Sequence, residues 1–191
     1  TGISEDIETL PTPILHQVAS TAFSSTKNRF YYTTNNNQLY RDIRSLHLAT
    51  EDKDLLFQDF RTGALTVADK TNEMWGVQHS GGSASLVYSK YPYQKMNGIV
   101  TFKVGEELTQ LAVSPNGDKL AAVLHLSNGS QSLVVADAKT ILSENKFQFD
   151  EIYTKGSPEN PSWTNEGSKI YFNAFTNGVS NIYCFDLNAQ T

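Results

Sequence analysis

The chain has very little cysteine. Its single cysteine, Cys184, excludes an internal disulfide. Cys184 stands in an alternating run, 182–185, of the kind that forms a β-strand, and because free cysteine is usually a small buried residue we expect it on one face of that strand. A nucleophilic cysteine needs a histidine and an orienting group beside it, and the neighbouring sequence contains neither.

The chain also lacks long apolar runs and an excess of positive charge. No stretch of 18 or more apolar residues occurs, so no segment is predicted to insert into a membrane as a helix. With 15 basic and 20 acidic residues, the net charge of −5 is the opposite of what a basic nucleic-acid-binding surface requires. We therefore expect a partner that is neither a nucleic acid nor a membrane.

What the sequence does contain is a turn motif that recurs four times. In the two clearest copies, 113–120 and 163–170, an apolar residue precedes the turn, Gly stands at the fifth place, Lys at the seventh and an apolar residue at the eighth. Two looser copies, 23–31 and 67–75, lack the Gly. The four starts are 44, 46 and 50 residues apart. Self-similarity at such a period is the signature of a repeat architecture.

Each copy continues in the same way, with a strand, a tight polar loop and another strand. Asn-Gly pairs, as in 128–129 and 177–178, strongly favour a β-hairpin because both residues accept a positive φ. The predicted second strands are 29–33, 74–79, 119–126 and 169–175, and the predicted third strands are 43–48, 85–88, 132–137 and 181–187. Three antiparallel strands plus a variable outer strand, repeated about every 45 residues, predict the blades of a β-propeller.

The predicted fold class is therefore all-β, a single propeller region over 1–191 with four blades. Their approximate bounds are 20–62, 63–106, 107–157 and 158–191, after an N-terminal extension, 1–19. A β-sandwich is the alternative, but it does not require the same turn at a fixed long period. No helix longer than one turn, at 139–145, is expected. Four blades are few for closing a propeller into a ring. We therefore expect a partial propeller, a propeller completed by self-association, or one in which 9–20 supplies the missing outer strand of the last blade.

The last two units carry a family resemblance, good over about 105–191 and only architectural before that. They resemble the TolB-like β-propeller repeat, a relative of the WD repeat, although Asn116 and Glu166 replace the Asp that usually precedes the turn Gly. The matching residues are Ser114, Pro115, Asn116, Gly117, Leu120 and Ala121, then Pro161, Ser162, Trp163, Gly167, Lys169 and Ile170, and finally Asn181, Ile182, Tyr183, Asp186 and Leu187. The resemblance implies a bacterial envelope protein, periplasmic or secreted, whose propeller is a docking surface.

Three functions are compatible with these observations. The first is a non-catalytic binding or scaffold module that contacts a protein partner or the rest of a larger polypeptide. The second is the substrate-gating propeller of a larger peptidase or hydrolase, as in the related prolyl oligopeptidases. The third is a carbohydrate or small-ligand binder that uses Trp75 and Phe175 at the channel mouth. The chain has neither a Gly-x-Ser-x-Gly elbow nor a phosphate-binding loop, so we expect no enzyme activity, no catalytic residue and no cofactor.

The repeat register also indicates a candidate ligand- or partner-binding site. The thirteenth place of each unit ends the second strand, next to the loops that lead into the innermost strands, and function on such scaffolds usually lies on loops. The candidate ligand- or partner-binding residues are His79, His125, Phe175, Arg61, Glu106 and Glu159. A metal held by His79, His125 and a carboxylate is one hypothesis. The alternative is that the two histidines stand a blade apart, too far to share one ion, and no metal is assigned.

Overall fold

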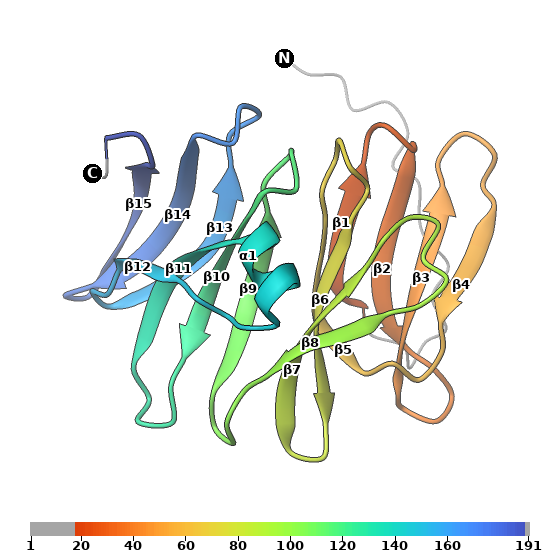
Figure 1. Cartoon of the computed structure of the whole chain (residues 1–191), viewed down its shortest axis with the longest axis horizontal. Helices are drawn as coiled ribbons and strands as arrows, with labels where there is room; N and C mark the ends of the chain where they lie inside the picture. The colour runs from red at the N-terminus through yellow and green to blue at the C-terminus, as the bar shows by residue number, and fades with distance from the viewer. Residues whose placement is uncertain (1–17, 190–191) are drawn as a thin grey trace.

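The computed structural model describes residues 18–189 and contains four antiparallel sheets, one after another along the chain (Figure 1). The first comprises β1 (Val18–Ser24), β2 (Arg29–Asn35), β3 (Arg41–His47) and β4 (Lys53–Phe57). The second comprises β5 (Thr62–Val67), β6 (Met74–Ser80), β7 (Ser83–Ser89) and β8 (Asn97–Thr101). The third comprises β9 (Glu107–Val113), β10 (Lys119–His125), β11 (Gln131–Asp137) and β12 (Asp150–Tyr153). The fourth comprises β13 (Ser157–Trp163), β14 (Lys169–Thr176) and β15 (Val179–Asp186).

This arrangement confirms the predicted four-bladed propeller. In every sheet the strands are paired in chain order, and the recurring turn joins the first strand to the second. The turn glycines Gly117 and Gly167 have φ values of 76° and 72°, in the left-handed region that glycine adopts without cost. In the two looser copies, Asn28 and Asn72 take that conformation one place later, with φ values of 48° and 57°. Asparagine tolerates it better than most residues, which explains how these turns form without glycine.

The first strands of the four blades lie innermost and contact one another in the order β1, β5, β9, β13. Figure 1 shows the blades side by side, with the first and fourth at opposite ends of the view. Across the described part of the chain, no comparable strand contact joins β13 back to β1. The four blades are therefore arranged as an arc about a shared axis.

Apolar side chains at matching places fill each interface between blades. The ninth place of the repeat holds Tyr31, Trp75 and Ala121 in the first three blades, and all three are 0% exposed. Trp75 packs against Tyr88 with ring centroids 4.6 Å apart, so it lies in the core rather than at the channel mouth as predicted. Burial of this kind is the dominant favourable contribution to folding.

The fourth blade has no neighbour on its far side among the described residues. Its ninth and thirteenth places hold Tyr171 and Phe175, which are 47% and 55% exposed, and Ile182 on β15 is 81% exposed. Cys184 is paired with Tyr171 across the strands, so it shares their face and is exposed. Cys184 therefore lies on one face of a strand, as predicted, but on a face that is exposed because no blade of the described chain packs on it.

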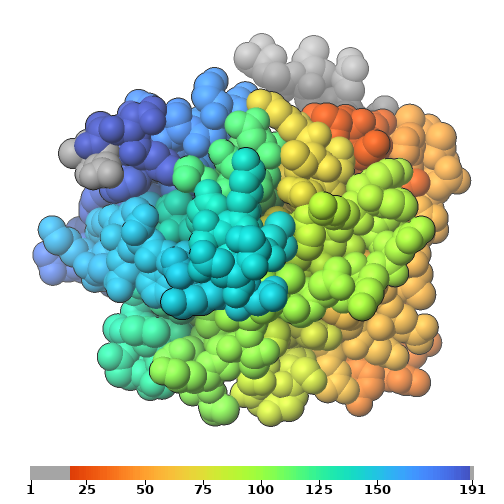
Figure 2. Space-filling view, viewed as in Figure 1, coloured from red at the N-terminus to blue at the C-terminus, as the bar shows by residue number. Residues whose placement is uncertain are grey.

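Two local predictions also need correction. The helix α1 (Ala138–Glu144) is longer than the single turn expected, with Ala138 and Ile141 buried between the second and third blades. In the space-filling view, the segment that carries α1 lies at the front of this junction (Figure 2). At the N-terminus, β1 begins at Val18, so residues 18 and 19 belong to the first blade; the rest of the expected extension lies outside the described residues. Residues 18–20 therefore do not supply an outer strand to the fourth blade.

Candidate binding site at the central cavity

Every innermost strand is interrupted near the same point of the repeat. Its pairing with the second strand shifts at Ala19 in the first blade, at 63–64 in the second, at 110–111 in the third and at 160–161 in the fourth. Such β-bulges bend a strand and redirect its side chains. Gln110 and Asn160 lie within them at φ values of 51° and 54°, a conformation uncommon for residues other than glycine.

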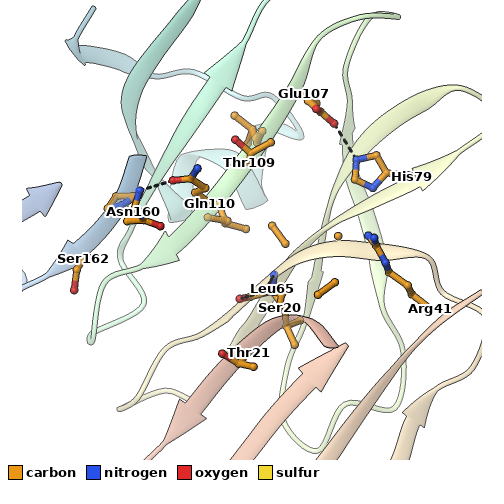
Figure 3. A pocket seen from close by; sticks show the side chains of 16 residues that line it. Ser20, Thr21, Arg41, Leu65, His79, Glu107, Thr109, Gln110, Asn160 and Ser162 are labelled. Carbon is orange, nitrogen blue, oxygen red and sulfur yellow. Dashed lines mark hydrogen bonds and ion pairs between the residues drawn. The ribbon is translucent and has the colours of Figure 1, made fainter. Parts of the chain in front are cut away.

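These bulges border a cavity of about 770 Å³ on the central axis (Figure 3). All four innermost strands contribute to its wall, and its volume falls in the range of about 300–1,000 Å³ that is typical of ligand sites. Its polar lining side chains are Ser20, Thr21, Arg41, His79, Glu107, Thr109, Gln110, Asn160 and Ser162. Most of these are uncharged groups that form hydrogen bonds.

The charged groups gather at the junction of the first three blades. His79 Nε2 lies 3.0 Å from Glu107 Oε2, which joins the second blade to the third. Arg41, the first residue of β3, approaches from the first blade, and its side chain points toward His79 in Figure 3. A Cβ atom at Gly63 would lie 2.8 Å from His79 Cε1 and 3.5 Å from Arg41 Nη1. The absence of a side chain at Gly63 therefore lets both groups approach the same point.

A chain of amides connects the third and fourth blades across the cavity. The backbone N–H of Asn160 donates to Gln110 Oε1, and the Asn160 side-chain amide donates to Asn173 Oδ1 over 3.0 Å. The Asn173 amide in turn donates to Glu159 Oε2 over 3.2 Å. Side chains that bond to one another in this way are held in place, so this wall is organised before any ligand arrives.

A second cavity, of about 630 Å³, opens beside the first and shares His79 and Glu107 with it. Four of the residues nominated from the repeat register line this second cavity, namely Arg61, His79, Glu106 and His125. The other two do not. Glu159 lies at the amide chain of the first cavity, and Phe175 lies on the exposed face of the fourth blade.

The two histidines at equivalent places have different partners. His79 contacts Glu107, whereas His125 Nε2 lies 2.8 Å from Thr109 Oγ1. Within residues 18–189, no group of three or more His, Cys, Asp or Glu side chains is placed to hold a metal ion. The geometry therefore gives no support to the hypothesis of a shared metal.

A buried carboxylate fixes the loop that carries Arg61. Asp42 Oδ1 accepts hydrogen bonds from Asn36 Nδ2 at 2.9 Å and from the Asp59 backbone N–H at 3.0 Å. Asp42 Oδ2 accepts from Arg44 Nη2 at 3.1 Å. The Arg61 guanidinium then lies 4.2 Å from the centre of the Tyr40 ring, a cation–π contact at the rim of the second cavity.

Sequence reasoning missed Arg41, Gln110 and Asn160. β3 begins at Arg41, two residues before the start at 43 that the sequence predicts. Gln110 and Asn160 reach the cavity because of bulges, and a bulge is a property of the pairing between strands rather than of one residue. The Asn-Pro pair at 160–161 was the one local signal of an irregular backbone at this point.

Comparison with solved structures identifies the type of fold. No protein-family model matches the chain, and no curated protein sequence matches it. Among solved structures, TolB from Acinetobacter baumannii superposes with a TM-score of 0.72 at 16% identity over 89% of this chain and 41% of that chain. The fold is that of a TolB-like β-propeller.

Other solved structures superpose on the chain with lower TM-scores. Dipeptidyl peptidase 4 from Porphyromonas gingivalis matches with a TM-score of 0.63 at 13% identity over 96% of this chain and 26% of that chain. The β-propeller domain of the Trilobed protease from Pyrococcus furiosus matches with a TM-score of 0.58 at 9% identity, over 92% of this chain and 56% of that chain. Of the Acinetobacter TolB described above, the chain spans about two fifths of the length.

The helical content of this TolB-like propeller is limited to α1 among the described residues. That helix has seven residues, and it is not long and apolar enough to cross a membrane.

Proposed function

We propose that the chain is a non-catalytic binding module that recognises a protein partner through the face on which the two cavities open. The observation that carries the proposal is the set of bulges at one place in all four innermost strands, which turns hydrogen-bonding side chains into one cavity. A rigid scaffold that presents polar groups around a concave surface is suited to specific binding. The rest of a larger polypeptide is included among the partners that such a face would accept.

We assign this module to the bacterial cell envelope, in the periplasm or outside the cell. The support is the TolB-like fold together with the acidic composition, which disfavours nucleic-acid partners. Fractionation of the native host with an antibody to the chain tests the assignment. Recovery of the protein in the cytoplasmic fraction would overturn it.

The binding face is tested by site-specific photo-crosslinking in the native host. A photoreactive residue replaces Thr21 in the cavity wall, and a control replaces Lys70, which lies in a turn at the opposite end of the second blade. We expect a discrete crosslinked protein from the cavity position alone. Crosslinks of equal yield from Lys70, or none from either position, would contradict a binding role for this face.

A second function is favoured by the coverage of the peptidase relative. The chain matches 26% of the Porphyromonas peptidase, in keeping with the substrate-gating propeller of a larger enzyme. In that case the crosslinked partner would be a catalytic domain of the same polypeptide. Mass spectrometry of the crosslink distinguishes this intramolecular partner from a separate protein.

A further inference from the structure

Arg41 is the arginine in the wall of the central cavity, and among the described residues it forms no ion pair there. Of the four arginines, Arg29 forms an ion pair with Asp54, Arg44 with Asp42, and Arg61 stacks on Tyr40. Among residues 18–189, no carboxylate lies within ion-pair distance of the Arg41 guanidinium and no group accepts a hydrogen bond from it. A half-buried guanidinium that lacks a hydrogen-bond acceptor costs free energy unless a bound group supplies that acceptor.

The surroundings of Arg41 leave room for that acceptor. Glu107 is the single carboxylate that lines this cavity, and it contacts His79 rather than Arg41. Because Gly63 has no side chain, the guanidinium and the imidazole lie beside each other over its backbone, in the wall of the cavity. The φ angle of Gly63 lies outside the left-handed region, so glycine is needed here for space and not for its backbone conformation.

The remainder of the wall is suited to an extended peptide. Hydroxyl and amide groups from Thr21, Gln110 and Ser162 line it together with the apolar residues Leu65 and Leu111. Peptide backbones offer matching N–H and C=O groups, and their side chains cover apolar surface. The cavity volume of about 770 Å³ is sufficient for a short segment.

We propose that the central cavity binds a carboxylate of a peptide segment of the partner, with the Arg41 guanidinium as its hydrogen-bonding counterion. This inference rests on the proposed function and specifies the partner's chemistry. A guanidinium presents a planar fork of N–H donors that matches a carboxylate in two parallel hydrogen bonds. The carboxylate comes either from a peptide C-terminus or from an Asp or Glu side chain.

The test uses ¹⁵N NMR titrations of the whole chain with three short peptides. One is an acetylated tetra-alanine with a free C-terminal carboxylate, the second is the same peptide amidated, and the third is an amidated peptide with one internal Asp. We expect cavity resonances to shift with the first or third peptide, which identifies the source of the carboxylate. Equal binding of the amidated tetra-alanine, or no binding of any peptide, would overturn the proposal.

Variants assign the effect to Arg41. Arg41→Gln removes the charge and is expected to weaken binding about 10-fold or more, as for the loss of a charged hydrogen bond. Lys70→Gln, at the opposite end of the second blade, removes the same charge and is expected to bind as the parent does. Gly63→Ala is a second probe, since its methyl group would lie 2.8 Å from His79 Cε1. Circular dichroism confirms that each variant is folded.

Two results would separate this inference from the proposed function. If Arg41→Gln binds the carboxylate peptides as tightly as the parent, the assignment of Arg41 fails. If the photo-crosslink from Thr21 persists in that same variant at full yield, the binding face stands while its carboxylate chemistry is wrong. Displacement of the peptides by an oligouronide, with tighter binding of the sugar, would overturn the choice of a peptide.

Discussion

Asp42 shows how much of the binding face depends on one buried side chain. It is 2% exposed, and its carboxylate holds three groups, two of them on the loops that border the cavities. Asp42→Ala removes this acceptor from all three donors, of which Asn36 Nδ2 retains a second acceptor in Asp59 Oδ1. We expect a loss of about 1–3 kcal/mol in the free energy of unfolding, measured by urea denaturation.

Asp54→Ala is the matched control for this prediction. Asp54 also pairs with an arginine, but it is 49% exposed, and an exposed ion pair contributes only about 0–1 kcal/mol. Equal destabilisation by the two substitutions would show that burial of Asp42 is not what makes its bonds important.

At the scale of the element, α1 depends on the residue that precedes it. Asp137 Oδ1 accepts hydrogen bonds from the Thr140 backbone N–H at 2.8 Å and from its hydroxyl at 3.0 Å. The backbone bond is the main reason that the pKa of Asp137 lies below its usual value. Asp137→Ala is expected to cost about 1 kcal/mol at pH 7, while Asp137→Asn, which also caps, retains most of the stability.

The pH dependence of this cap follows from the direction of the pKa shift. A carboxyl group whose pKa is lowered by folding stabilises the protein above its unfolded pKa of about 3.9, and the contribution is lost as pH falls through the folded value. Urea midpoints at pH 7 and below pH 3 should therefore show a smaller difference between Asp137→Ala and the parent in acid. A difference that does not change with pH would contradict the role of the ionised carboxylate.

The elements also show what sequence can and cannot predict. The turns were found because Gly117 and Gly167 need a left-handed backbone, and the strands between them because apolar residues alternate. Burial of Trp75 and the place of Phe175 on the uncovered face of the fourth blade were not predicted, because both depend on whether a neighbouring blade covers the strand. The cavity wall was found in part: His79 is fixed by the repeat register, while Arg41 enters through the packing of one blade on the next.

At the scale of the whole molecule, the uncovered face of the fourth blade is an association hazard. In the first three blades the places equivalent to Tyr171 and Ile182 are buried by the next sheet, whereas here Tyr171, Phe175 and Ile182 face outward. Exposed apolar sheet faces of this kind drive self-association. We expect the chain to associate in a concentration-dependent manner, and Ile182→Lys to shift it toward the monomer in light scattering.

Val104→Lys is the control for the face of the fourth blade. Val104 is 78% exposed, close to the 81% of Ile182, but it lies in the loop between the second and third blades rather than on this face. It should leave the association unchanged. A stable monomer of the parent chain at all concentrations would remove the argument for self-association.

The shared position of the bulges has a consequence for how such a protein changes over evolutionary time. Residues 63–64, 110–111 and 160–161 lie outside the regular pairing of their strands, so their side chains are free of the ladder that holds each blade together. Mutations at these residues alter the cavity wall one blade at a time while the scaffold is preserved. The cavity is thus an evolvable surface, in which duplication of a blade also duplicates a place for new recognition.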